Sequence, residues 1–190
     1  MTPIEPVPTP IEARDEAPVR VVLRGAAELI DDAAIAQVYP GTPWMFGAGL
    51  VVPLGPSKHP LLLDFDAAWH RLGELDQSLN LVPLALVAEL PIGHGLFIGA
   101  GPTVTLFSET HPADATGVAV TRGARIAAEL RAGGRFDTGL VQEPMPPSTG
   151  GPVHALEFEV YVARRQERPG HSDGFDLGAW RGVVGLSLCF

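Results

Sequence analysis

The sequence predicts an α+β domain, with a mixed or mainly antiparallel sheet, about three helices packed on it and a proline-rich N-terminal arm. The stretch 103–141 reads as a strand, a helix and a second strand. Strict alternation of apolar and polar residues at 154–163 and 180–190 is typical of sheet strands. The first 18 residues contain five prolines, which favour an extended arm. We therefore expect an arm at 1–18 and a single α+β domain at 19–190.

Composition limits the function classes. A length of 190 residues predicts one domain, and 46% hydrophobic against 18% charged residues suggests apolar surface buried in a homo-oligomer. The net charge of −9 disfavours nucleic acid as the main partner. Cys189 is the only cysteine, and the start MTPIEPVPTP lacks the pattern of a signal peptide. With no apolar run near the ~20 residues of a membrane helix, we expect no membrane partner and a location in the cytoplasm or in an assembled particle such as a virion.

The N-terminal half contains two predicted helices. A short strand at 19–24 precedes a helix at 27–38, which ends at the breaker Tyr39-Pro40-Gly41. Asp66 is a candidate cap for the second helix, at 67–79, on which His70 faces solvent. The segments 50–54 and 61–65 are predicted strands. The segment 84–90 fits a strand or a helix, and we favour a strand.

The loop after the first helix carries Trp44, Met45 and Phe46. An exposed patch of this kind would form an interface, whereas a buried one would pack as a lid. We keep both readings and count these residues among the interface candidates.

A polar cluster lies where the strand 103–108 meets the third predicted helix, which ends at Gly133-Gly134. Such a junction could bind an anion or position an acid/base pair, and the simpler interpretation is helix capping. The cluster consists of Ser108, Glu109, His111 and Asp114.

The C-terminal part supplies the remaining interface candidates. These are Pro144 and Met145 in the loop 142–152, and Trp180 and Phe190 on the last strand. On the strand 154–163 we expect the apolar face to be buried and the face with Glu157 and Glu159 to be exposed to solvent. A terminal phenylalanine on an alternating strand resembles outer-membrane barrels. Without an export signal or a run of ~10-residue alternating strands, we interpret it as a strand of a soluble fold.

No complete catalytic or ligand-binding motif is present. The six histidines lack H-E-x-x-H spacing, and a lone cysteine makes no zinc ribbon, so we predict no metal and no cofactor. Four glycines at 93–101 lie between strands and are read as turn glycines rather than a phosphate loop. We therefore lean towards a protein that is not an enzyme.

The element order at 19–163 resembles the tail-terminator, or tail-completion, proteins of long-tailed phages. A helix runs into YPGTP, strands follow, and the helix with ARIAAEL precedes the strand HALEFEVYV. The resemblance implies a small α/β domain that assembles into a homo-oligomeric ring with other structural proteins of the particle. The resemblance does not assign the role of any functional residue of those proteins to a residue of this chain.

Two alternatives stay open. Residues 84–129 resemble the acetyl-CoA-binding region of N-acetyltransferases, where Gly117 and Ala119 fit the pyrophosphate loop and Asp114 does not, because its charge repels phosphate. The other alternative is a small-molecule-binding domain with its pocket between the sheet and the Trp44 loop.

Overall fold

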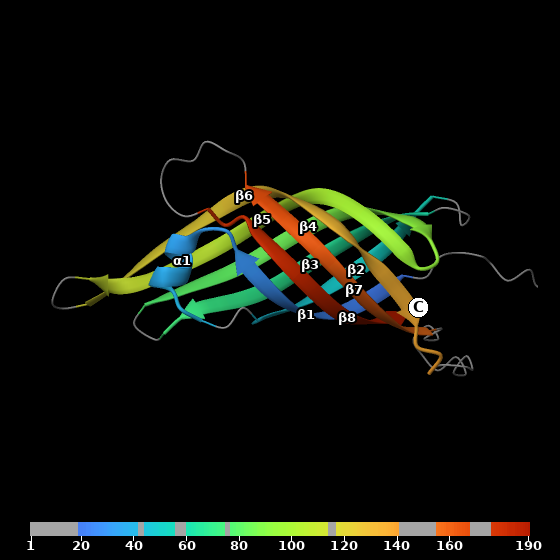
Figure 1. Cartoon of the computed structure of the whole chain (residues 1–190), viewed down its shortest axis with the longest axis horizontal. Coiled ribbons are helices and arrows are strands. Elements are labelled where there is room, and N and C mark those ends of the chain that lie inside the picture. The colour runs from blue at the N-terminus through green and yellow to red at the C-terminus, as the bar shows by residue number, and fades with distance from the viewer. Residues whose placement is uncertain are drawn as a thin grey trace, which may run out of the picture.

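A computed structural model shows that the chain forms a closed barrel of eight antiparallel strands in sequence order (Figure 1). The structure describes residues 19–41, 44–55, 60–74, 77–113, 117–140, 155–167 and 176–190. The proposed arm at 1–18 lies outside these residues.

Each strand pairs with its neighbours in the sequence, and β1 pairs with β8 to close the barrel. The strands are β1 (Arg20–Ile30), β2 (Trp44–Leu54), β3 (Leu61–Gly73), β4 (Ser78–Gly93), β5 (Leu96–Ala113), β6 (Gly117–Asp137), β7 (Ala155–Glu167) and β8 (Ala179–Cys189). One short helix, α1 (Ala33–Val38), follows β1, and the Asp32 carboxylate caps it by accepting a hydrogen bond from the Ala34 amide.

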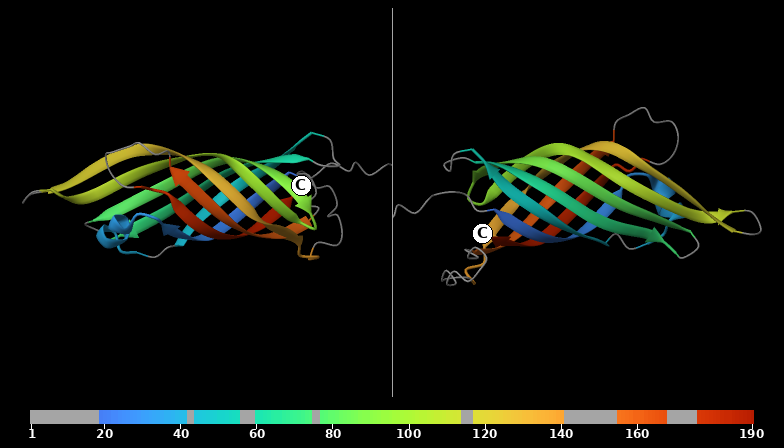
Figure 2. Two further views of the ribbon diagram at one scale, coloured as in Figure 1. Left: turned by 45° about the horizontal axis from the view of Figure 1, so that its top comes forward. Right: turned by 180° about the vertical axis from the view of Figure 1, so that it is seen from behind.

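The two ends of the barrel differ (Figure 2). The start of β1 and the end of β8 lie together at one end, called the terminal end here. At the other, the α1 end, α1 lies beside the barrel mouth and the β5–β6 hairpin extends beyond it. At the terminal end, β4 and β5 are joined by a tight turn in which His94 and Gly95 both have positive φ, 53° and 77°. Such a two-residue turn matches the twist of the strands.

The α+β prediction is wrong, because the described residues form strands almost throughout. The predicted helix at 67–79 belongs to β3 and β4, and the one after Pro112 belongs to the β5–β6 hairpin. Of the first predicted helix, only Ala33–Val38 is helical, since β1 continues to Ile30. Alanine, leucine, glutamate and arginine favour helices locally, and pairing with two neighbouring strands overrides that preference.

The alternation predicted for β7 is correct, but its two faces are reversed. Phe158, Val160 and Val162 point outwards and are exposed, whereas Glu159 and Tyr161 point into the barrel and are buried. The strand β8 repeats this arrangement without interruption. In this barrel the apolar face is therefore the outer one.

Apolar side chains close the interior towards both ends. At the terminal end, Val22, Val51 and Leu62 form one buried cluster. At the α1 end, Ile35 and Tyr39 of the helix segment pack on strand residues and on Leu177. The helix α1 thus covers the barrel mouth.

Candidate functional site

Charged side chains fill the middle of the barrel. All point inwards from the strands, and each is at most 9% exposed. The arginines are Arg24, Arg131, Arg135, Arg165 and Arg181, and the acids are Glu28, Asp64, Asp66, Glu89, Glu129 and Glu159. Buried charges are tolerated only when they are paired and hydrogen-bonded, so the pairing of this set decides whether the interior is stable.

Two arginines join strands that lie far apart in the sequence. Arg24 of β1 donates to Asp64 at 2.7 Å and to Glu159 at 2.6 Å, which connects β1 to β3 and β7. Arg131 of β6 donates to Asp64 at 2.6 Å and to Glu129 at 2.5 Å, and also contacts Asp66. The bonds of Arg24 to Asp64 and Glu159, and of Arg131 to Asp64, thus join strands that are not neighbours in the barrel, whereas the bond to Glu129 lies within β6.

The remaining arginines extend the network towards both ends. Arg135 bridges Glu89 at 2.6 Å and Glu159 at 3.1 Å. Arg165 donates to Glu28 at 2.9 Å and to the Leu177 carbonyl at 2.8 Å. Arg181 pairs with Glu129. His70, predicted to face solvent, is buried instead, with its Nδ1 3.7 Å from a Glu28 oxygen.

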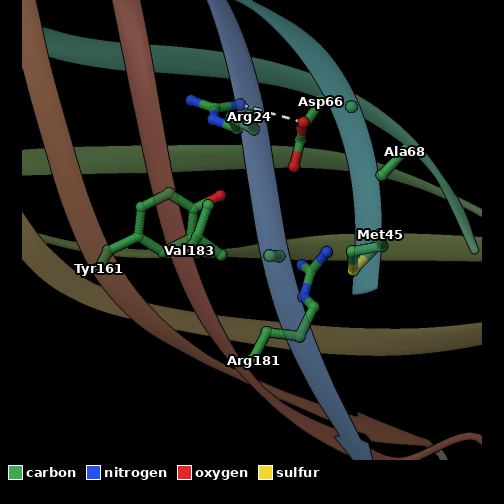
Figure 3. A pocket seen from close by; sticks show the side chains of 9 residues that line it. Arg24, Met45, Asp66, Ala68, Tyr161, Arg181 and Val183 are labelled. Atoms are coloured by element: carbon green, nitrogen blue, oxygen red, sulfur yellow. Dashed lines mark ion pairs between the residues drawn. The ribbon is translucent and has the colours of Figure 1, made fainter. Parts of the chain in front are cut away.

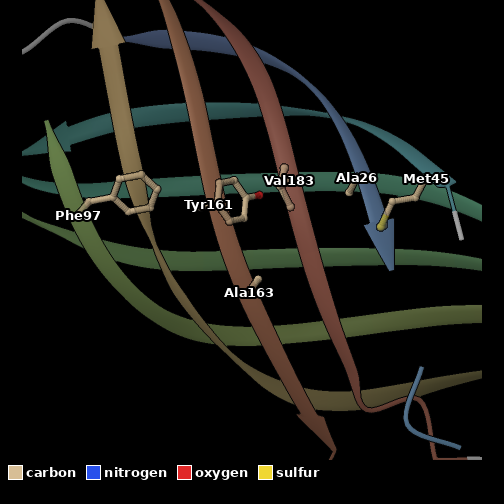
Figure 4. Close-up of a cluster of buried hydrophobic side chains, with 6 residues drawn as sticks. All are labelled: Ala26, Met45, Phe97, Tyr161, Ala163 and Val183. Carbon is tan, nitrogen blue, oxygen red and sulfur yellow. The ribbon is translucent and has the colours of Figure 1, made fainter. Parts of the chain in front are cut away.

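Tyr161 packs among these arginines and leaves little free volume. Its ring lies 5.1 Å from the Arg131 guanidinium and 5.7 Å from that of Arg24, and Phe97 meets it edge to face at 6.0 Å (Figure 4). Beside the Tyr161 hydroxyl lies a cavity of about 10 Å³, which has room for one water (Figure 3). A side chain at Gly49 would collide with Arg24, so this glycine makes room for the network.

The outer surface of the barrel is an apolar band. The outward positions of β8 are Trp180, Gly182, Val184, Leu186 and Leu188, and the exposed Phe190 follows directly after the strand. The other strands have outward side chains of the same kind, among them Leu23, Ile126 and Leu130 at 60–71% exposure. Within the described strands, the outward charges are Arg71, Arg122 and Arg164, all towards the α1 end.

Aromatic side chains mark both edges of this band. Trp44, Phe46, Trp69 and Trp180 are exposed near the α1 end, and Phe136, Phe158 and Phe190 near the terminal end. Trp180 on β8 and Phe190, directly after its end, are ten residues apart. At ~3.3 Å per residue and a tilt of about 40°, the band is about 25 Å tall. That is the height of the apolar band of barrels that span membranes.

A separate contact fastens α1 over the barrel mouth. The Tyr39 hydroxyl donates to a carboxylate oxygen of Glu109 on β5. Burial is the main cause, and this hydrogen bond the second, of a pKa of Tyr39 that lies above its ordinary value. Tyr39 therefore stays protonated and bound across the physiological pH range.

The structure separates the polar cluster predicted from sequence. Glu109 binds Tyr39, while Ser108 lies on the outer face of β5 and His111 lies further along the same strand. Because β5 continues through this region, these residues cap no helix. Asp114 lies outside the described residues. Sequence reasoning missed the buried ion pairs because their members come from strands whose register only the closed barrel fixes.

The interface candidates also separate. Trp44, Phe46, Trp180 and Phe190 are exposed on the outer band, whereas Met45 points into the interior and is 1% exposed. Pro144 and Met145 lie outside the described residues.

The described residues show no cluster of side chains placed to bind a metal ion. No three or more His, Cys, Asp and Glu side chains among them are arranged to hold a metal ion. In the same part of the chain, no helix is long and apolar enough to cross a membrane.

Comparisons with known proteins give fold likenesses alone. No protein-family model matches, and no curated protein matches. The chain is similar to the outer membrane protein Ail of Yersinia pestis, solved in a phospholipid bilayer nanodisc, at 10% identity, 91% and 100% coverage of the two chains and a TM-score of 0.47. It is also similar to Neisserial surface protein A, at 8% identity, with 90% and 96% of the two chains covered and a TM-score of 0.44. Its similarity to the beta domain of the Bordetella autotransporter BrkA has 10% identity, with 93% and 100% of the two chains covered and a TM-score of 0.39.

Several functional expectations are wrong. A closed all-β barrel is neither the α/β domain of a tail-terminator ring nor the strand-helix site of an acetyltransferase, since Gly117 and Ala119 lie on β6. The apolar surplus that suggested a soluble homo-oligomer surrounds the barrel as a band. Such an exterior contradicts the expected absence of a membrane partner and the expected cytoplasmic or virion location, because apolar patches far smaller than this are rare on soluble proteins.

Proposed function

We propose that the protein is an integral membrane β-barrel of the outer-membrane type, which serves as a bilayer-embedded scaffold with a closed lumen. The observation that carries the proposal is the reversed distribution of side chains, charged inside and apolar outside. Water cannot satisfy backbone groups within a bilayer, and a closed barrel satisfies them all between strands. Trp44, Phe46, Trp180 and Phe190 then contact lipid at the two edges of the band.

The filled interior favours a scaffold over an open pore. The lumen is crossed by ion pairs of Arg24, Arg131 and Arg135, and α1 covers one mouth. An eight-stranded barrel encloses just enough space for side chains to fill. The parts that remain free to act lie outside the band, above all the β5–β6 hairpin beyond the Ser108–Arg122 pair.

The test is insertion into phosphatidylcholine vesicles, measured through the three tryptophans. Lipids brominated along the acyl chains should quench their fluorescence, most strongly with bromine near the headgroup, because the tryptophans lie at one edge of the band. Aqueous iodide should quench weakly. Strong iodide quenching together with no effect of brominated lipid would contradict the proposal.

A further inference from the structure

Four outward-facing polar residues form a continuous row across four neighbouring strands at the α1 end. Arg71 on β3 pairs in register with Asn80 on β4, Asn80 with Ser108 on β5, and Ser108 with Arg122 on β6. Neighbouring strands lie ~4.8 Å apart, so the row is about 14 Å long. We call these residues the Arg71–Arg122 row.

On β3, β4 and β5 the row lies at the limit of the apolar band towards the α1 end, whereas on β6 the exposed Val120 lies beyond it. Directly below it, towards the terminal end, the next outward residues on the four strands are Trp69, Val82, Leu106 and Ala124. An amphipathic molecule placed here would therefore meet polar donors next to apolar surface. Because the strands are tilted by about 40°, the row is inclined to the band, and Arg122 lies about 9 Å further towards the α1 end than Arg71.

Among the described residues, the two arginines of the row differ from the other arginines in lacking a partner. Neither Arg71 nor Arg122 has an ion pair or side-chain hydrogen bond within the part of the chain that the structure describes. Arg164, the third outward arginine, pairs with Asp31 at 2.5 Å and stacks on Trp180 at 5.3 Å.

We propose that the Arg71–Arg122 row binds the phosphates of anionic membrane lipids, whose acyl chains lie along the apolar band below. Two guanidinium groups supply charge-assisted, bidentate bonds to phosphate, and Asn80 and Ser108 supply neutral donors between them. Within the described strands, no outward charge marks the terminal edge of the band. The row thus selects the leaflet richer in anionic headgroups, and this inference rests on the proposed membrane insertion.

The experiment measures lipid selectivity beside the row. A Trp180→Phe background leaves Trp44 and Trp69 as the fluorophores, and both lie next to Arg71. The protein is inserted into phosphatidylcholine vesicles that contain a small fraction of headgroup-nitroxide phosphatidylglycerol or headgroup-nitroxide phosphatidylcholine. Each arginine near a membrane surface adds about fivefold to the binding of anionic lipid, so we expect the phosphatidylglycerol probe to be preferred by ~25-fold.

Two variants separate the row from general surface charge. The double variant R71Q/R122Q should lose the preference, whereas R164Q should keep it, because Arg164 is already neutralised by Asp31. Equal quenching by the two probes in the Trp180→Phe protein, or an unchanged preference in R71Q/R122Q, would overturn the proposal.

Two further outcomes are distinguishable. Inorganic phosphate that abolishes the preference at constant ionic strength would assign the row to a soluble phosphate anion and overturn the lipid proposal. If neither probe quenches while aqueous iodide does, the protein has not inserted, and both this inference and the proposed function fail.

Discussion

A charge placed on the outer band distinguishes a barrel in lipid from a barrel in water. Val184 lies on the outer face of β8, 51% exposed, four residues from Trp180 and six from Phe190. At ~3.3 Å per residue and a tilt of about 40°, it lies about 10 Å from one edge of the band and about 15 Å from the other. Val184→Arg therefore puts a cation near the centre of the bilayer.

We expect Val184→Arg to lower the free energy of unfolding by about 2–4 kcal/mol, the cost of an arginine at the midplane of a membrane barrel. The matched control is Leu29→Arg. Leu29 is 70% exposed and pairs with Trp180 at the edge of the band, where the cost falls to about 0–1 kcal/mol.

The assay is guanidinium unfolding from phosphatidylcholine vesicles, followed by tryptophan fluorescence with the linear extrapolation of stability. In water, both substitutions replace exposed apolar side chains and would change stability by no more than about 0.5 kcal/mol. Equal and small effects of Val184→Arg and Leu29→Arg in vesicles would refute the reasoning.

Three other predictions concern the interior and α1. Arg131→Gln leaves Asp64 and Glu129 short of a cation, and in the same unfolding assay it should cost about 3–5 kcal/mol, against about 1 kcal/mol or less for Arg20→Gln, whose pair with Glu157 is partly exposed. Tyr39→Phe keeps the packing and removes the hydrogen bond to Glu109, so amide exchange in α1 should accelerate by about tenfold. Arg131 variants should show the same tenfold difference in α1 exchange between Tyr39 and Phe at this position. Because the pKa of Tyr39 is raised, the stability that Tyr39 contributes is complete below the ordinary tyrosine pKa of about 10 and is lost only as pH rises through the higher folded-state value. The protection of α1 amides from exchange, corrected for intrinsic exchange rates, should therefore stay constant from about pH 6 to 9. An earlier loss would contradict the Tyr39–Glu109 contact.

The sequence by itself determined where many of the strands lie. The alternation in β7 and β8 is readable because side chains of a strand point to opposite faces in turn. The prediction that each of these two strands has one apolar and one polar face was also correct. Sequence gave no measure of which face meets solvent, because that depends on whether the solvent is water or lipid, and the usual rule of apolar inside led to the reversed assignment.

Only the tertiary structure decided the rest. The segment 117–137 alternates less clearly, because alanine and glycine occupy outward positions beside Ile126 and Leu130, and its alanines favoured a helix until pairing with β5 and β7 fixed it as β6. The ion network depends on closure as well. Arg24 and Glu159 are 135 positions apart, and Arg131 and Asp64 are 67 apart. They meet because β1 pairs with β8 and closes the sheet, which turns the charged faces of eight separate strands into one shared interior.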